Sequence, residues 1–244
     1  MFDNLKLPIR FGHLATDPIL LVDTDILSNI CKGQNDKNTE LELLKNKVTL
    51  LYSLSSIMEL GFGPTNKSAT EEVKFYRELY NRHSALQNDI FVSEFHLKYQ
   101  TGQMNHIKGK WIGVSPDSHN WFAAKTTLIS YMDERATKPK NAKQLQTDVL
   151  LSCAAWNAGA FIWTNNVKDH LLASYYMSHR KCSGNQDPRK VKNCIANHMA
   201  PIFDTNSLNK IVNGETFNIY TEMKKKTKNT DIIKVLEIAE DICS

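Results

Sequence analysis

The sequence lacks any apolar stretch that approaches the ~20 residues a helix needs to cross a lipid bilayer. Its first residues, Met1 to Lys6, also lack the basic-then-apolar order of a secretory signal. Internal repeats and low-complexity tracts are absent too, whereas 41% of the residues are hydrophobic, enough for a sizeable core. We therefore expect a globular protein with no membrane association, and the cytoplasm is the expected compartment.

Cysteine is scarce, and its number is odd. The five cysteines are spread along the chain at Cys31, Cys153, Cys182, Cys194 and Cys243. Small secreted proteins stapled by disulfides instead carry a dense and usually even set. The sequence therefore predicts free thiols in a reducing compartment.

An excess of one charge is also missing, because the net charge is only +4 over 244 residues. No whole-molecule field therefore indicates a nucleic-acid partner. Locally, residues 180–192 hold five basic side chains and one acidic side chain. The net charge of this segment is therefore +4, equal to that of the whole chain. These residues could contact RNA phosphates or simply form a solvated face. The candidates are Arg180, Lys181, Arg189, Lys190 and Lys192, and the lysine-rich run 224–228 is a second candidate.

Strand-like and helix-like patterns alternate along the chain, which predicts an α/β fold with a parallel sheet flanked by helices. Strands are expected at 19–22, 48–52, 111–114 and 161–163, and helices at about 25–33, 37–46, from 55, 71–86, 119–132 and between Thr147 and Gly159. A last helix should bury Ile232, Val235, Leu236, Ala239 and Ile242. Ligands of such sheets bind beyond the carboxyl ends of the strands, where Asp23 and Asn166 fall.

The predicted organisation has three parts. Residues 1–17 are expected to form an N-terminal extension, and 18–175 the α/β domain, with an insertion at 87–110. Residues 176–244 are expected to form a basic C-terminal appendage.

Three acidic residues adjoin elements that otherwise have the composition of a buried core. Asp23 follows an apolar run, Glu59 lies in the first turns of the helix expected from Ser55, and Asp148 opens another helix. A buried carboxylate is costly unless it is paired, and a shared Mg²⁺ or Mn²⁺ would compensate all three. Without a metal, Asp23 would cap a helix, Glu59 would be a solvated surface acid, and Asp148 would complement a helix N-terminus.

In order and spacing, four segments resemble the motifs of the PIN domain. This metal-dependent nuclease fold occurs in many toxins of toxin–antitoxin pairs and in RNA-processing enzymes. The segments are 20–28, 54–63, 148–160 and 161–170. The resemblance covers roughly residues 18 to 175 and implies a PIN-like parallel sheet.

On this resemblance Asp23, Glu59 and Asp148 match the metal-binding acids of the family. Its fourth site position falls on Asn166, an amide that would orient water or phosphate, with Asp169 as an outer helper or a helix cap. Asp25 would support the site from the second layer, bind a second ion or cap a helix. The implied activity is metal-dependent hydrolysis of single-stranded RNA, leaving 5'-phosphate and 3'-hydroxyl ends. The implied partners are an antitoxin protein and a second copy of the chain.

Two other functions stay open. An RNA- or protein-binding PIN-like module with little activity is compatible with the amide at Asn166 and with the long C-terminal part. The order Asp23-Thr24-Asp25 also resembles haloacid-dehalogenase-like phosphatases, in which Asp23 would be a nucleophile. That family expects threonine or valine where this chain has Leu27.

A second cluster has the ligand types and local spacings of a structural Zn²⁺ site. Its members are His179, Cys182, Cys194 and His198. The order of the ligands is unusual, and chance occurrence is the alternative. Two further histidines, His119 and His170, fall near the expected active face, but the sequence shows no partner for either.

Overall fold

A computed structural model describes residues 1–31, 33–53, 90–91, 148, 151–152, 155–156, 159–184 and 187–244. The predicted helices from Ser55, at 71–86 and at 119–132 lie outside these residues, as do Glu59, His119 and the strand predicted at 111–114. Within the described part, no helix is long and apolar enough to cross a bilayer.

The centre of the fold is a five-stranded sheet in the order β3-β2-β1-β4-β5. Every neighbouring pair is parallel, which confirms the predicted α/β sheet. The register pairs Val22 of β1 with Tyr52 of β2 and with Trp163 of β4. The strands are β1 (Ile19–Val22), β2 (Thr49–Ser53), β3 (Ile90–Phe91), β4 (Phe161–Trp163) and β5 (Ile202–Phe203).

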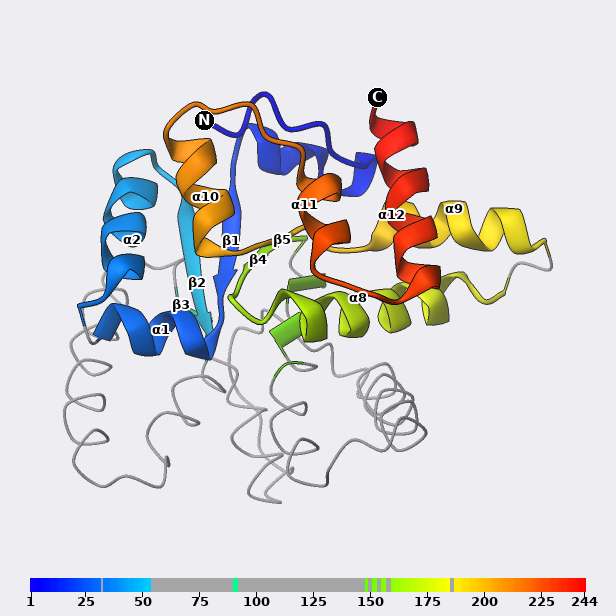
Figure 1. Ribbon diagram of the computed structural model, residues 1–244, viewed down its shortest axis with the longest axis horizontal. Coiled ribbons are helices and arrows are strands. Elements are labelled where there is room, and N and C mark those ends of the chain that lie inside the picture. Colours follow the sequence, from blue (N-terminus) through cyan, green and yellow to red (C-terminus); the bar gives the residue numbers. More distant parts are fainter. Residues whose placement is uncertain are drawn as a thin grey trace, which may run out of the picture.

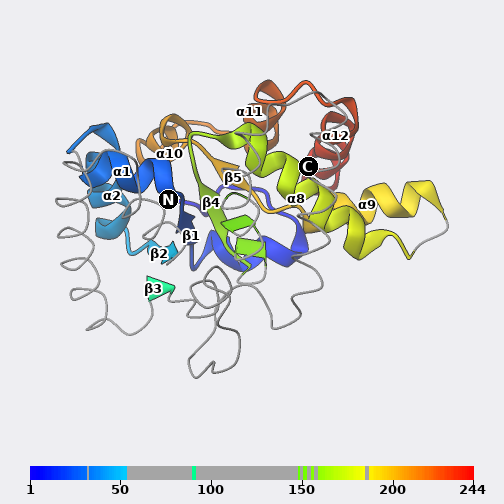
Figure 2. The same ribbon diagram turned by 90° about the horizontal axis from the view of Figure 1, so that it is seen from below.

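Helices connect these strands and cover the sheet (Figure 1). They are η1 (Ile9–Ala15), α1 (Thr24–Cys31), α2 (Asn35–Lys45), α8 (Val167–Cys182), α9 (Pro188–His198), α10 (Thr205–Val212), α11 (Ile219–Lys225) and α12 (Thr230–Cys243). Figure 2 shows α1, α2 and α10 on one side of the sheet and η1 on the other. Because parallel crossovers are right-handed, α1 and α2, which lead to β2, and α8 and α9, which lead to β5, belong to opposite faces.

Helices on both faces explain the continuous apolar runs of the strands. Leu20, Leu21 and Val22 of β1 are all buried, as is Trp163 of β4. The indole Nε1 of Trp163 donates a hydrogen bond to Thr205 Oγ1 at 3.0 Å, so this large side chain is buried without an unpaired donor. This bond joins the end of β4 to the start of α10.

The chain ends belong to this same core. Phe2, Phe11 and Leu14 of the predicted extension are fully buried. The boundary predicted after residue 175 falls inside α8, and β5, from the predicted appendage, pairs with β4. Residues beyond 175 therefore contribute a strand to the sheet and do not form a separate appendage. Likewise β3, within the predicted insertion, extends the sheet beside β2.

The last helix follows its predicted pattern closely. Ile232, Val235, Leu236 and Ala239 are buried as expected. Ile242 is instead 45% exposed, because it lies at the end of α12 and past the surface that the helix covers. The face is therefore one turn shorter than the pattern suggested.

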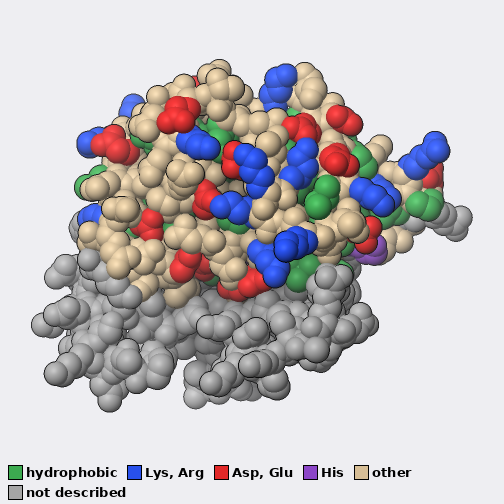
Figure 3. All heavy atoms as spheres, in the orientation of Figure 1, with side chains coloured by type: hydrophobic (Ala, Val, Ile, Leu, Met, Phe, Trp, Pro, Cys, Tyr) green, Lys and Arg blue, Asp and Glu red, His purple; other side chains and the backbone are tan. Residues whose placement is uncertain are grey.

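Acidic partners compensate the lysine-rich run near the C-terminus. Lys224 pairs with Glu240 at 2.6 Å, Lys225 with Glu222 at 2.9 Å, and Lys226 with Asp204 at 2.7 Å. Figure 3 shows basic and acidic side chains interspersed on this face. Lys224 therefore links α11 to α12, Lys226 links the end of α11 to the residue that caps α10, and the charges of these three lysines are compensated.

Asp204 shows how such a pair contributes to stability. Its side chain caps α10 by accepting the Ser207 backbone N–H at 2.8 Å. Burial raises the pKa of this carboxyl, but hydrogen bonds from Lys226 and Ser207 and the charge of Lys226 outweigh burial, so the pKa lies below its usual value. A depressed carboxyl pKa stabilises the fold above the unfolded value of about 4, and this contribution is lost as the pH falls through the folded-state pKa.

We expect Asp204→Ala to lower the free energy of unfolding by about 1 kcal/mol at pH 7. Asp204→Asn keeps a capping group without charge, so its deficit should shrink as the pH is lowered below about 4. Urea unfolding at several pH values measures both variants, with Lys226→Gln as the matched loss of the partner. A deficit of Asp204→Asn that does not change with pH would contradict this account.

Candidate functional site

The candidate site lies where the strand order reverses, between β1 and β4. In open parallel sheets this switch point leaves a crevice at the carboxyl ends of the strands. Asp23 directly follows β1, and its backbone N–H donates to the carbonyl of Trp163 at 2.9 Å, which extends the ladder by one residue. The predicted position of Asp23 at the carboxyl end of its strand is confirmed.

Asp23 does more than begin a helix. One oxygen, Oδ1, accepts the backbone N–H of Thr24 at 2.6 Å, at the start of α1. The other, Oδ2, accepts the Thr164 hydroxyl at 2.7 Å and contacts His170 Nε2 at 3.1 Å. The carboxylate thus joins β1, the end of β4 and α8, and the helix-capping interpretation accounts for only one of its oxygens.

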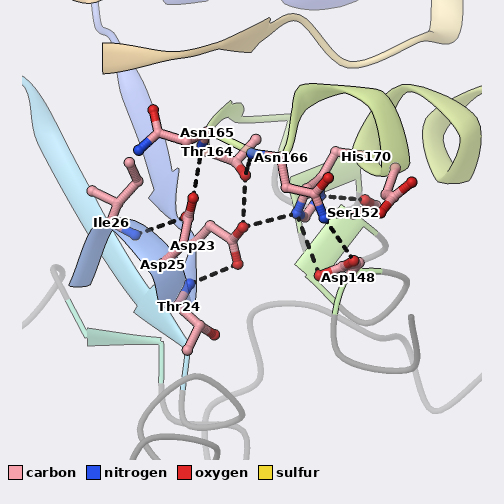
Figure 4. Close-up of polar contacts among 11 residues, drawn as sticks. Asp23, Thr24, Asp25, Ile26, Asp148, Ser152, Thr164, Asn165, Asn166 and His170 are labelled. Atoms are coloured by element: carbon pink, nitrogen blue, oxygen red, sulfur yellow. Dashed lines mark hydrogen bonds and ion pairs between the residues drawn. The ribbon is translucent and has the colours of Figure 1, made fainter. Parts of the chain in front are cut away.

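His170 lies at the centre of the cluster (Figure 4). Its Nε2 is 3.1 Å from Asp23 Oδ2 and 3.8 Å from Asp148 Oδ1, while Nδ1 is 2.9 Å from Ser152 Oγ. The imidazole is fully buried and the Asp23 side chain is 5% exposed. Ser152 closes the far side of the ring, so both ring nitrogens have partners.

The charges of this pair stabilise each other. Burial lowers the pKa of His170, but the charge of Asp23, its hydrogen bond and the charge of Asp148 outweigh burial and raise the pKa to about 9. Burial would raise the pKa of Asp23, but the charge and hydrogen bonds of His170, with Thr164 and Thr24, hold it below its usual value. At neutral pH an imidazolium therefore neutralises a buried carboxylate.

Asn166 holds Asp148 in place. Its Nδ2 donates to Asp148 Oδ2 at 3.2 Å and to Asp169 Oδ2 at 3.0 Å, and its backbone N–H donates to Thr164 Oγ1 at 2.9 Å. One amide group thus bridges two carboxylates that would otherwise repel each other. Asn166 and Asp169 therefore lie beside Asp148, and in this arrangement the amide orients an acid, whereas the sequence suggested that it orients water or phosphate.

Asp25 braces the loop after β4. Its carboxylate accepts the backbone N–H groups of Ile26 at 2.7 Å and Asn165 at 3.0 Å. Burial and the nearby charge of Asp23 raise the pKa of Asp25 to about 7. Through these contacts Asp25 ties the start of α1 to the loop after β4.

The donor set fits a divalent cation. Asp23, Asp148 and His170 each offer a ligand atom, and these atoms lie within 4.8 Å of one another. Carboxylate oxygens suit Mg²⁺ and Mn²⁺, whereas His170 would have to lose its proton before its Nε2 could bind an ion. The imidazolium already supplies positive charge between the two acids, which is the charge that a cation would supply there.

The roles of His170 and Ser152 were not predicted from the sequence. A signal was present, because Ser152 follows Asp148 by four residues and His170 follows Asn166 by four. On a helix this spacing puts both members on one face. Asp148 and Asn166, each at the expected start of a helix, were therefore each followed one turn later by a polar residue that could face the same site.

The second predicted cluster is assembled in part. Cys182 and Cys194 form a disulfide between α8 and α9, so the prediction of free thiols is wrong for these two and confirmed for Cys243. The disulfide was missed because twelve residues of sequence do not reveal that two helices fold back on each other. His198 lies beside this pair, whereas His179 is exposed and outside the cluster.

The basic residues 180–192 lie around the other end of α8. A helix of 16 residues is about 24 Å long, and α8 begins beside the candidate site and ends at Cys182. Lys181, Arg189 and Lys190 are exposed there, and Lys192 is half-buried. Any contact they make with a bound nucleic acid would therefore be remote from Asp23.

Comparisons with known proteins found no match, so the function is inferred from the geometry of the site. No protein-family model, no curated protein and no solved structure matches the chain.

Removal of the buried imidazole should show how much its pairing with Asp23 contributes to the free energy of unfolding. We expect His170→Ala to lower the free energy of unfolding by about 3 kcal/mol, because Asp23 loses its cationic partner. In an Asp23→Asn background the same replacement should cost about 1–3 kcal/mol less. Urea unfolding of the wild type, both single variants and the double variant measures this coupling.

Ser152→Ala is the control, since it removes only a hydroxyl next to the ring and should cost about 1 kcal/mol. An equal cost of His170→Ala in both backgrounds would show that the ion pair with Asp23 does not carry the stability.

Proposed function

We propose that the protein is a metal-dependent endoribonuclease that cleaves single-stranded RNA, with a PIN-like catalytic domain. The observation that carries the proposal is the convergence of Asp23, Asp148 and His170 at the switch point of a parallel sheet. The order of motifs along the sequence adds to it. The regulatory setting of a toxin with a small antitoxin partner, and pairing with a second copy, follow from the resemblance alone.

Each side chain has a task in this proposal. A bound Mg²⁺ or Mn²⁺ supplies Lewis-acid stabilisation of the phosphodiester and a more acidic water. Asp23 and Asp148 hold the cation, with Glu59 as a third ligand by resemblance. Asn166 fixes the orientation of Asp148 through its 3.2 Å hydrogen bond. Thr164 and His170 fix Asp23 by contacts of 2.7 and 3.1 Å, so both carboxylates keep their places as substrate arrives.

The contacts of Asp23 weigh against the phosphatase alternative. A nucleophilic aspartate needs an oxygen that can reach phosphorus in line, but both oxygens of Asp23 accept hydrogen bonds and the side chain is 5% exposed. Holding a cation needs a carboxylate that stays in place, and these contacts keep Asp23 in place. The carboxylate is therefore better suited to binding a metal than to forming a phosphoenzyme.

The decisive test uses a labelled circular single-stranded RNA, which only an endonuclease can open. We expect cleavage by the wild type with Mn²⁺ or Mg²⁺, and none with a chelator. Asp148→Asn should reduce the rate by at least ~100-fold, since loss of a group outside the ligand layer already costs up to that much. Asp241→Asn, the same change on the exposed part of α12, should cleave at the wild-type rate.

Circular dichroism of each variant separates loss of the site from loss of the fold. Cleavage that persists in a folded Asp148→Asn variant would refute the assignment. RNA or protein binding without cleavage under any metal would favour the binding module. Hydrolysis of a small phosphomonoester, abolished by Asp23→Asn, would favour the phosphatase.

A further inference from the structure

A second group of metal-ligating side chains lies where α8 and α9 meet, apart from the acidic site. Cys182, at the C-terminal end of α8, is buried, while Cys194 and His198 of α9 are half-buried. Their ligand atoms all lie within 4.8 Å of one another. Cys194 Sγ is 3.8 Å from His198 Nδ1. The group is therefore compact and also reachable from solvent.

The chemistry of these donors suits zinc better than the hard ions of the acidic site. Thiolate and imidazole are the ligands of structural Zn²⁺, at about 2.3 and 2.0–2.1 Å. Tetrahedral geometry at those lengths separates a sulfur from a nitrogen by roughly 3.5 Å, close to the 3.8 Å between Cys194 and His198. The imidazole would need only a small shift, whereas the two sulfurs, which are bonded to each other here, would have to separate to roughly 3.8 Å after reduction.

The two sulfurs cannot bind an ion while they are joined to each other. We propose that this disulfide is one of two states of the same clamp, and that in the reduced chain Cys182, Cys194 and His198 bind Zn²⁺. Either state connects the end of α8 to α9. The helices would then stay joined in oxidising and in reducing surroundings alike.

The exchange balances in two steps. A dithiol reductant supplies two electrons and two protons, is itself oxidised to a disulfide, and leaves two thiols on the protein. Binding of Zn²⁺ then releases the two thiol protons, so two thiolates and a neutral imidazole surround the ion. Three protein ligands leave the fourth tetrahedral position to water.

The surroundings hold His198 ready for this role. Cys194 and His198 are four residues apart on α9, so both face the end of α8. The imidazole stacks on Trp156 with ring centroids 6.3 Å apart, and Arg10 covers the indole at 4.0 Å. His198 Nδ1 lies 2.8 Å from the carbonyl of Cys194 and would exchange this hydrogen bond for the ion.

Co²⁺ is the probe, because a thiolate–cobalt bond gives a sulfur-to-metal charge-transfer absorption that carboxylates cannot give. We expect the full chain, reduced with a dithiol and freed of reductant under anaerobic conditions, to develop this absorption with one equivalent of Co²⁺. Added Zn²⁺ should remove it. The oxidised chain should show none.

Variants assign the ligands. His198→Ala keeps both cysteines, and we expect its reduced form to bind Co²⁺ at least ~100-fold more weakly. His179→Ala and Cys243→Ser are matched controls, since both residues lie outside the cluster, and each should bind like the wild type. Circular dichroism confirms that each reduced variant is folded.

Three results would overturn the proposal. One is a disulfide that resists excess dithiol in the folded chain. Another is a reduced, folded chain without the thiolate absorption. The third is equal Co²⁺ affinity of His198→Ala and the wild type, which would leave the pair a simple disulfide.

Discussion

Parallel pairing of β1 with β4 is the constraint on which the candidate site depends. The crossovers from these two strands run in opposite directions, the arrangement that leaves a crevice beyond the carboxyl ends of the strands in open parallel sheets. The register sets Val22 beside Trp163, and the next residues, Asp23 and Thr164, therefore meet at 2.7 Å. A shift of this register by one residue would turn the side chains to the opposite face and dissolve the cluster.

Charge compensation then determines what can be buried there. A lone carboxylate as buried as Asp23 would destabilise the fold. His170, in the first turns of α8, offsets this penalty by pairing with it. The same helix ends at Cys182, which is joined to α9. One helix thus supports the acidic cluster at its start and the sulfur cluster at its end. Its position against the sheet matters to both.

The sequence predicted local features well and long-range contacts poorly. The β1 and β4 strands, the helix C-cap at Gly159, whose φ is +59°, and the end-of-strand position of Asp23 follow from apolar runs and turn residues. The pairing of β5 with β4 and the buried Phe2 depend on contacts between distant parts of the chain, which no local pattern encodes. The ion pair of His170 with Asp23 spans 147 residues and was missed for that reason.

The most direct test of the account is a crystal structure of the protein soaked in Mn²⁺, read from the anomalous scattering of the metal. The account predicts a peak between the carboxylates of Asp23 and Asp148, at about 2–2.5 Å from their nearest oxygens. Ordered Mn²⁺ only at other places, with Asp23 still bound to His170 as it is here, would contradict it. The acids would then be a buried structural ion pair, and the case for a metal-dependent nuclease would lose its central support.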